Sequence, residues 1–321
     1  MQACSLDFQR SLQDFRARLG PARNADQALD LLLLDMMSST RDELSSPFPD
    51  EKYQAAAHRW PSSVELAWLS FNHCVGPNCD REAELQRLIA ADPDNTATWM
   101  AAMASARERD DWKGWAVALK HASEARFYDP GTGVVVLRTH ELLVQVPAPD
   151  SCMSTMARLA SSFGHRHDDS ERIDIMAQGF ESAVSLPFFP ALRLCGSSTP
   201  ALTELQRKQC LVVLSMVAQG DTLMEQTFAL HGLLELENDP TRLRQWREQY
   251  RQIKWLVAQI GMGLEADGLP PHFITFRWSK GEFQAYKSLA IQRHRWPPPP
   301  DWLPDDARSR ALITGEPPPP N

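Results

Sequence analysis

Apolar residues recur at helical spacing along almost the whole chain. In the segment 241–262, successive apolar positions are separated by 3, 4, 3, 4 and 3 residues, namely Leu243, Trp246, Tyr250, Ile253, Val257 and Ile260. Such spacing places them on one stripe of a long helix. Apolar residues at similar spacing, interrupted by proline, glycine and Asp-Pro signals, predict helices at 6–19, 25–37, 152–162, 171–185, 200–219, 222–237 and 241–262. Asn24 is a candidate cap for the second of these helices. The pattern therefore predicts an all-α fold.

Two segments depart from the helical pattern. Aromatic and β-branched residues crowd the stretch Phe273 to Trp278 ahead of a Lys-Gly turn, which predicts a short strand or an extended strap. From Pro297 onward the chain is a proline-rich tail that contains two runs of four consecutive prolines. Such runs favour the stiff, extended polyproline II conformation. We expect this tail to lie along the helices with Trp296 and Trp302 as anchors, or to be offered to a partner.

A recurring arrangement marks the first half of the chain. Pro61, Pro93 and Pro130 each precede a short polar capping segment, and a bulky apolar residue follows six or seven positions on. The prolines lie 32 and 37 residues apart. This spacing is close to the length of a two-helix unit in helical-repeat proteins.

On these residues the chain resembles the tetratricopeptide repeat family over about residues 61 to 146. With Pro130 at the closing proline of a repeat, Ala118 and Ala125 fall on its two small-residue positions, and Trp99 matches its first-helix tryptophan after a short insertion. Met103 and Ala106 stand where the family has glycine and tyrosine. The resemblance implies paired, stacked helices. The chain also resembles exported, cysteine-paired helical proteins of xanthomonad-type bacteria.

The expected organisation has three parts. Residues 1–150 form a tetratricopeptide-like array of helical hairpins, residues 151–296 form a second helical half packed on it, and residues 297–321 form the tail. The boundary is placed at the linker that begins with Pro147.

Composition supports a folded protein with an uneven use of proline. The chain has 321 residues, of which 43% are apolar, so a sizeable core is available. It contains 24 prolines, and nine of them lie in the tail, so the proline excess belongs to the tail and not to the helical region.

Charge and hydropathy exclude some partners. The net charge of -8 argues against nucleic acid or an anionic lipid surface as the main partner. The most apolar run, near Leu31 to Leu34, is cut by Asp30 and Asp35 and predicts a buried helix rather than a membrane span. The N-terminal residues do not have the pattern of a signal peptide. We therefore expect the chain to be either cytosolic or already trimmed of such a peptide.

Six cysteines favour the second alternative. Cys74 and Cys79 flank a turn sequence, and Cys195 and Cys210 bracket a loop and a short stretch of helix, so both pairs have the spacing of loop disulfides. In the chain-entropy model these bridges would contribute about 2 and about 3 kcal/mol. Cys4 and Cys152 remain for a long-range bridge, one of 15 connectivities. Six buried thiols in a cytosolic protein are the alternative. Most basic residues are arginines, as in GC-rich bacterial genomes, and oxidised cysteines there indicate the periplasm.

Candidate chemistry is sparse. The Gly131 to Val136 stretch lacks the third glycine of a dinucleotide fingerprint, and His140-Glu141 lacks the second histidine of a zinc protease. The densest group of metal-ligand types is His165, His167 and Asp168, which could serve a metal-dependent hydrolase. Helix capping is the alternative for this cluster. No phosphate loop or nucleophile elbow accompanies it, so the prediction is a non-enzyme without cofactor or metal.

The predicted partner-binding residues lie in the last third of the chain. Arg244, Arg247 and Arg251 follow one stripe beside the apolar seam of 241–262, where they could receive an acidic partner. A solvated polar face is the alternative. Among the ten tryptophans, Trp68, Trp99, Trp112 and Trp115 are expected in the core, whereas Trp278, Trp296 and Trp302 are expected at an interface.

Stacked hairpins suit the binding of a protein or peptide better than chemistry. The sequence therefore predicts a periplasmic protein-protein interaction protein. In its sharper form this protein is an immunity protein or inhibitor that binds a secreted antibacterial effector. A structural envelope scaffold is a further alternative.

Overall fold

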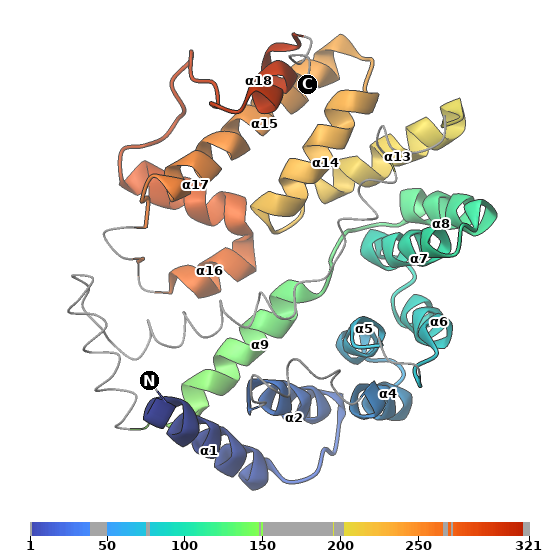
Figure 1. Cartoon of the computed structure of the whole chain (residues 1–321), viewed down its shortest axis with the longest axis vertical. Helices are drawn as coiled ribbons and strands as arrows, with labels where there is room; N and C mark the ends of the chain where they lie inside the picture. The colour runs from blue at the N-terminus through green and yellow to red at the C-terminus, as the bar shows by residue number, and fades with distance from the viewer. Residues whose placement is uncertain are drawn as a thin grey trace. The chain divides into compact units, whose positions relative to one another are not determined.

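The structure is a computed structural model that describes residues 2–38, 50–74, 78–147, 149, 195, 202–265, 269–270 and 272–316. Every regular element in these residues is a helix, so the all-α prediction is confirmed for them (Figure 1). The only β-type pairing in this part of the chain is a single bridge between Asn95 and Phe127. The helices predicted at 152–162 and 171–185 lie outside the described residues.

Local capping signals set the helix boundaries that the sequence predicts. Helix α2 (Ala25–Ser38) begins after Asn24, whose side chain accepts a 2.9 Å hydrogen bond from the amide of Gln27. Helix α14 (Leu223–Leu236) begins with a capping box, and α15 (Pro240–Gly261) begins after the Asp239 cap. Helix α13 (Glu204–Val217) starts later than predicted from position 200, because Thr203 forms the capping box at its start.

Two expectations about the C-terminal part are wrong. The stretch Phe273 to Trp278 is not a strand but part of helix α16 (Phe273–Lys280). Aromatic and β-branched residues favour a strand only weakly, and this stretch is helical despite that preference. The predicted turn after it exists, because Gly281 has a φ of 81°, a conformation that glycine adopts without strain. The tail is not extended throughout either, since Asp306 caps helix α18 (Ala307–Thr314) inside it.

The chain divides into two compact units, which are described separately. The first comprises Met1–Pro93, Gly131–Leu186 and Pro270–Ile274. Its helices, besides α2, are α1 (Gln2–Leu19), α4 (Asp50–Arg59), α5 (Val64–Asn72), α6 (Arg81–Ala91) and α9 (Thr132–Gln145). Consecutive helices pack in pairs, α1 on α2, α4 on α5 and α5 on α6, and α9 packs on α2. Leu33, Leu66 and Leu88 are completely buried in this unit.

A partly buried ion pair joins α2 to α9. Arg138 donates from Nε and Nη2 to the two carboxylate oxygens of Asp30, at 2.6 and 2.8 Å. Asp30 is 6% exposed, and its two hydrogen bonds raise the pKa of Arg138. Parallel bonds of this kind fix the orientation of two helices as well as their separation.

The second unit comprises Asp94–Pro130, Pro187–Leu269 and Thr275–Asn321. Besides α13, α14, α15 and α18 it contains α7 (Thr96–Glu108), α8 (Trp112–Glu124) and α17 (Glu282–Gln292). Helices α7, α8, α13, α14 and α15 pack in that order, and α15 also packs on α17 and α18 (Figure 1). Its fully buried residues include Leu119, Leu214 and Leu256.

The repeat prolines stand where the sequence pattern predicts helix starts. Pro61, Pro93 and Pro130 precede α5, α7 and α9, and the caps of these helices are Ser63, Asn95 and Gly131. The hairpin α7–α8 is held together at its open end. There the buried Asn95 donates to the carbonyl of Asp129 at 2.6 Å and accepts from its amide at 3.0 Å.

The alanines of the repeat alignment and the tryptophans expected in the core differ in their burial. Ala118 is buried on α8, whereas Ala125 is the C-cap residue of that helix. Of the tryptophans expected in the core, Trp68 and Trp115 are buried. Trp99 stacks on His121, and Trp112 is exposed at the start of α8. The predicted domain boundary at 150 and the residues 151–194 lie outside the described residues.

Candidate protein-binding face on helix α15

Helix α15 carries the seam and the basic stripe that the sequence singles out. Asp239 accepts hydrogen bonds from the amides of Thr241 and Arg242 at 2.7 and 3.0 Å, and these bonds lower the pKa of Asp239. The apolar seam faces the unit's core at Tyr250 and Ile253, which are buried. Val257, also in the predicted seam, is 43% exposed. The seam is therefore confirmed in its middle and open near the end of the helix.

The three arginines of the stripe have different surroundings. Arg244 is exposed and donates only to the hydroxyl of Thr241 at 3.3 Å among the contacts described for it. Arg247 is half-buried, and its guanidinium lies against Gly315, where a φ of 79° and the lack of a Cβ allow the close approach. Within the described residues, no acceptor bonds to its Nε, which is buried.

Arg251 has the most contacts of the three. It donates from Nε and Nη2 to the carboxylate of Glu248 at 2.9 and 3.1 Å, and this pair lowers the pKa of Glu248. Its Nη1 donates to the carbonyl of Pro299 at 2.8 Å. The stripe is thus open at Arg244 and covered by the C-terminal segment at Arg247 and Arg251.

The three predicted interface tryptophans do not form one surface. Trp278 is 4% exposed and contributes to the core, with Arg277 over its ring at 5.2 Å. Trp296 contacts Phe283 of α17 edge-on, at 6.2 Å between ring centroids. Only Trp302 lies on α15, where its ring meets Trp255 edge-on at 5.0 Å.

Sequence reasoning missed two α15 residues that contact the C-terminal segment. The indole of Trp255 donates to the carbonyl of Arg295 at 2.8 Å. The hydroxyl of Tyr250 lies 3.1 Å from that of Ser309 on α18, and burial raises the pKa of Tyr250. The signal for Trp255 was present, since it follows Arg251 by four residues and therefore shares its helix face.

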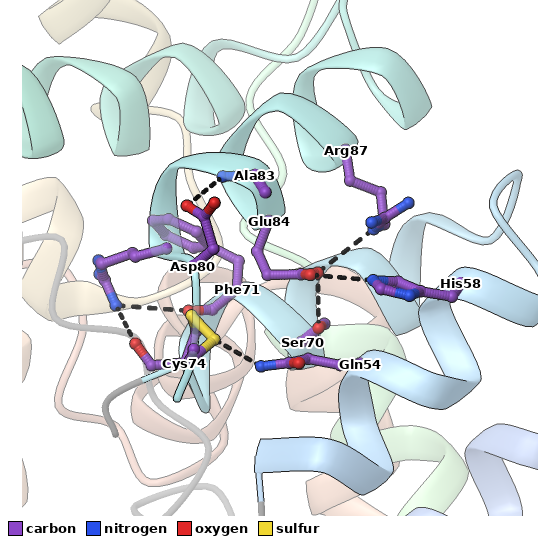
Figure 2. Close-up of a disulfide and its surroundings, with 11 residues drawn as sticks. Gln54, His58, Ser70, Phe71, Cys74, Asp80, Ala83, Glu84 and Arg87 are labelled. Atoms are coloured by element: carbon purple, nitrogen blue, oxygen red, sulfur yellow. Dashed lines mark hydrogen bonds and ion pairs between the residues drawn. A yellow bond between two sulfur atoms is a disulfide. The ribbon is translucent and has the colours of Figure 1, made fainter. Parts of the chain in front are cut away.

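A disulfide lies between α5 and α6 in the first unit (Figure 2). Cys74 and Cys79 are bonded, with 5.4 Å between their Cα atoms, as the sequence predicts. Arg81 donates to the carbonyls of Phe71 and Cys74 at 3.4 and 3.2 Å and lies over the Phe71 ring. The bridge and the arginine together fix the turn between the two helices.

Beside this disulfide, a buried carboxylate joins three helices. Figure 2 shows Glu84 of α6 between Ser70 of α5 and His58 of α4. Its carboxylate accepts from Ser70 at 2.7 Å and from Arg87 at 3.3 Å, and it lies 3.2 Å from Nε2 of His58. Serine, histidine and carboxylate also form nucleophilic triads, but there the serine bonds to the histidine. Here both bond to the carboxylate and Ser70 is 1% exposed, so the cluster has the arrangement of a structural link.

The second predicted disulfide is also formed. Cys195 and Cys210 are bonded, with 5.5 Å between their Cα atoms, and both are buried. The pair Cys4–Cys152 lies outside the residues whose side chains are described. Two bonded pairs at the predicted positions indicate an oxidising compartment.

The alternative metal cluster, His165, His167 and Asp168, also lies outside the described residues. In the part of the chain that is described, no three His, Cys, Asp or Glu side chains are grouped to hold a metal ion. None of the described helices is both long and apolar enough to span a bilayer.

Comparison of the chain with protein-family models, with curated proteins and with solved structures gave no match.

Proposed function

We propose that this chain is a non-catalytic protein-protein interaction protein of an oxidising bacterial compartment, the periplasm, and that α15 carries part of its binding surface. The observation that carries the proposal is the way α15 holds another stretch of polypeptide. Its polar face donates hydrogen bonds to two backbone carbonyls, at Arg295 and Pro299. Both contacts are to the chain's own C-terminal segment, and they support the proposal because they show that this face of α15 holds a stretch of polypeptide through its backbone.

Charge supports an acidic partner for this part of the chain. Residues 240–321 contain 12 of the 33 Lys and Arg but only 8 of the 41 Asp and Glu, although the whole chain is acidic. The C-terminal part is therefore net basic, and Arg244 projects from it into solvent. Complementary charge increases the rate of encounter and suppresses wrong partners.

In its sharper form the proposal is an immunity protein or inhibitor that neutralises a secreted antibacterial effector. What supports it is the resemblance to exported helical proteins, together with the disulfides Cys74–Cys79 and Cys195–Cys210. A structural scaffold of the envelope would have the same disulfides but would bind several envelope proteins.

A capture experiment from periplasmic extract tests the proposal. The full chain should retain one partner under stringent washing if it is an immunity protein, and several envelope proteins if it is a scaffold. The variant Arg244→Glu should weaken capture, and Arg10→Glu, an exposed arginine on α1, is the matched control. Failure to retain any protein, or equal capture by both variants and the wild type, would argue against α15 as the binding surface.

The compartment is tested separately by mass. Protein from its native host should gain mass on reduction and alkylation at Cys74, Cys79, Cys195 and Cys210. Free thiols at all four positions in the native material would remove the periplasmic assignment.

A further inference from the structure

The two disulfides of the described residues differ in how accessible their sulfurs are. Cys195 and Cys210 are 1% and 0% exposed. In the other bridge Cys74 is 3% exposed, whereas Cys79 is partly exposed to solvent. Thiol–disulfide exchange begins when a thiolate attacks one sulfur of a bridge, so its rate depends on access to that sulfur. The Cys74–Cys79 bridge therefore presents Cys79 to an incoming thiolate, whereas the folded protein presents neither sulfur of the other bridge.

The surroundings of Cys79 favour the thiolate form of its sulfur. Figure 2 shows the side chain of Gln54, from α4, beside the bridge, and its amide donates to Sγ of Cys79 at 2.6 Å. Cys79 directly precedes Asp80, the cap of α6, and so lies at the positive end of that helix. The carboxylate of Asp80 opposes this effect, but it is exposed to solvent and accepts from the amide of Ala83 at 3.0 Å. A hydrogen-bond donor and a helix N-terminus both stabilise a thiolate.

A cation lies beside the other cysteine of the bridge. Nη1 of Arg81 donates to the carbonyl of Cys74 at 3.2 Å, and the guanidinium lies over the ring of Phe71 at 4.4 Å. A sulfur leaves more readily as a thiolate when a positive charge is close to it. The Cα atoms of Cys74 and Cys79 are 5.4 Å apart, so a released Cys74 stays within reach of Cys79 and can close the bridge again.

Opening this bridge leaves the three helices around it joined. Glu84 of α6 accepts from Ser70 of α5 at 2.7 Å and lies 3.2 Å from Nε2 of His58 on α4. This link involves neither cysteine, and α5 also packs directly on α4 and on α6. Reduction therefore removes one covalent link from a region that other contacts hold, so the exchange does not require the unit to unfold.

We propose that the Cys74–Cys79 bridge is a redox-active site that exchanges with a small external thiol such as glutathione while the protein stays folded, and that Cys195–Cys210 is a permanent structural bridge. In the first step a thiolate attacks Sγ of Cys79 and forms a mixed disulfide, and the electron pair of the broken bond goes to Sγ of Cys74, which takes up a proton. A second thiolate attacks the sulfur of the bound thiol, and Cys79 leaves as a thiolate. Two external thiols are thus oxidised to one disulfide, and the bridge is reduced by two electrons.

The first experiment incubates the oxidised full-length protein with reduced glutathione under native conditions. Samples are quenched with acid, and their free thiols are alkylated and assigned by peptide mass mapping. We expect Cys74 and Cys79 to become alkylated at least about tenfold faster than Cys195 and Cys210, because access to the sulfur controls the rate. In denaturant, where all sulfurs are accessible, this ratio should fall.

A matched pair of single variants tests which sulfur is attacked. Cys74→Ser leaves the thiol of Cys79, and Cys79→Ser leaves the thiol of Cys74. We expect the Cys79 thiol to form a mixed disulfide with oxidised glutathione at least about tenfold faster than the Cys74 thiol, because it is accessible and its thiolate is stabilised.

The contribution of Gln54 is tested in the Cys74→Ser chain. Gln54→Leu removes the donor from Sγ of Cys79 and keeps a side chain of similar size, so it should slow the reaction of Cys79 by at least about threefold. Gln86→Leu, an exposed site on α6, is the matched control and should leave the rate unchanged. Equal rates in the two variants would overturn the role given to the α4 donor.

Circular dichroism and hydrogen exchange establish whether the chain is folded when only the first bridge is reduced. Reduction of both bridges at the same rate would overturn the proposal, as would reduction of Cys74–Cys79 only when the helices unfold, or a faster reaction of Cys74 than of Cys79. The glutathione experiment uses only the wild-type chain, so it decides the main point even if a variant fails to fold. The inference does not rest on the proposed function, and failure of the capture experiment leaves it standing.

Discussion

Two glutamates are buried among the residues that the structure describes, and their surroundings differ. Glu84, in the first unit, is 3% exposed and accepts from Ser70 and Arg87 beside the ring of His58. Glu225, in the second unit, is 8% exposed, and its carboxylate accepts from Tyr128 at 2.7 Å and from the hydroxyl of Thr222 at 2.8 Å. Within the described residues, none of the groups that bond to Glu225 is a cation.

The difference shows that burial alone does not define the role of a carboxylate. Glu84 lies against the guanidinium of Arg87, bonds to Ser70 and lies beside Nε2 of His58, and so joins α4, α5 and α6. Beside hydroxyl groups, Glu225 completes the capping box of α14 with Thr222, and burial raises its pKa. The same substitution should therefore have opposite effects at the two positions.

The largest expected effect is that of Glu84→Gln. The amide oxygen can still accept from Ser70 and Arg87, with the NH₂ turned toward Nε2 of His58, but the negative charge beside the guanidinium of Arg87 is lost. We expect a loss of about 2–3 kcal/mol in the free energy of unfolding, which is less than the cost of breaking a fully buried ion pair because His58 is half-exposed. Urea denaturation, with hydrogen exchange of the α6 amides as a local measure, tests it. Glu82→Gln, an exposed site on the same helix, is the control and should change stability by less than about 0.5 kcal/mol.

Sequence reasoning reached the helix starts but not this carboxylate. Asn24, Thr222 and Asp239 are local signals, because a cap bonds to amides two or three residues away. Glu84 follows Glu82 in an acidic first turn, and nothing in that pattern distinguishes the buried residue from the exposed one. Its role depends on α4 and α5 and so is a property of the packing.

The same reasoning explains the results for the candidate site. The basic stripe on α15 was found because it is a helical periodicity, and both predicted loop disulfides were found because the cysteines are close in sequence. The donor role of Trp255 was missed because its acceptor, the carbonyl of Arg295, is 40 residues away. The strand predicted at Phe273 shows that side-chain preference alone is a weak guide to a short element.

Removal of the neighbouring disulfide should have the next largest effect. Cys74→Ser with Cys79→Ser should lower the free energy of unfolding by about 2 kcal/mol, as expected for a short closed loop. The loss should appear in the exchange of α5 and α6 and leave α14 unchanged. If the double variant is as stable as the oxidised wild type, the bridge does not stabilise the hairpin. The oxidised wild-type chain is the comparison, because complete reduction would also break Cys195–Cys210.

Ser70→Ala should have a smaller effect on the same cluster. It removes one 2.7 Å hydrogen bond to the carboxylate but leaves Arg87 and His58 in place. Hydrogen bonds to charged groups contribute about 1.5–3 kcal/mol, and the removal of both the donor and its volume here should cost about 1–2 kcal/mol. Combined with Glu84→Gln, the loss should be less than additive, because the two side chains are bonded to each other. Strict additivity in urea denaturation would show that they act independently.

The smallest effect, and the one of opposite sign, is expected for Glu225→Gln. Because the folded pKa of Glu225 lies above its ordinary value of 4.5, the folded protein binds the proton at a higher pH than the unfolded chain does. The free energy of unfolding therefore falls as the pH rises between the two values, and the loss is complete above the folded pKa. Glutamine stays neutral and still suits a capping box, so it should avoid this loss. Weaker interaction with the helix dipole opposes the gain, so we expect Glu225→Gln to raise the free energy of unfolding by about 0.5 kcal/mol at pH 7.

The advantage of Glu225→Gln over the wild type should disappear near pH 4.5, whereas Glu124→Gln, an exposed control on α8, should show no such dependence. Urea denaturation of both variants at pH 7 and pH 4.5 measures the difference. If Glu225→Gln destabilises the protein at pH 7 as Glu84→Gln does, the charge of Glu225 is itself stabilising and the contrast between the two sites does not hold.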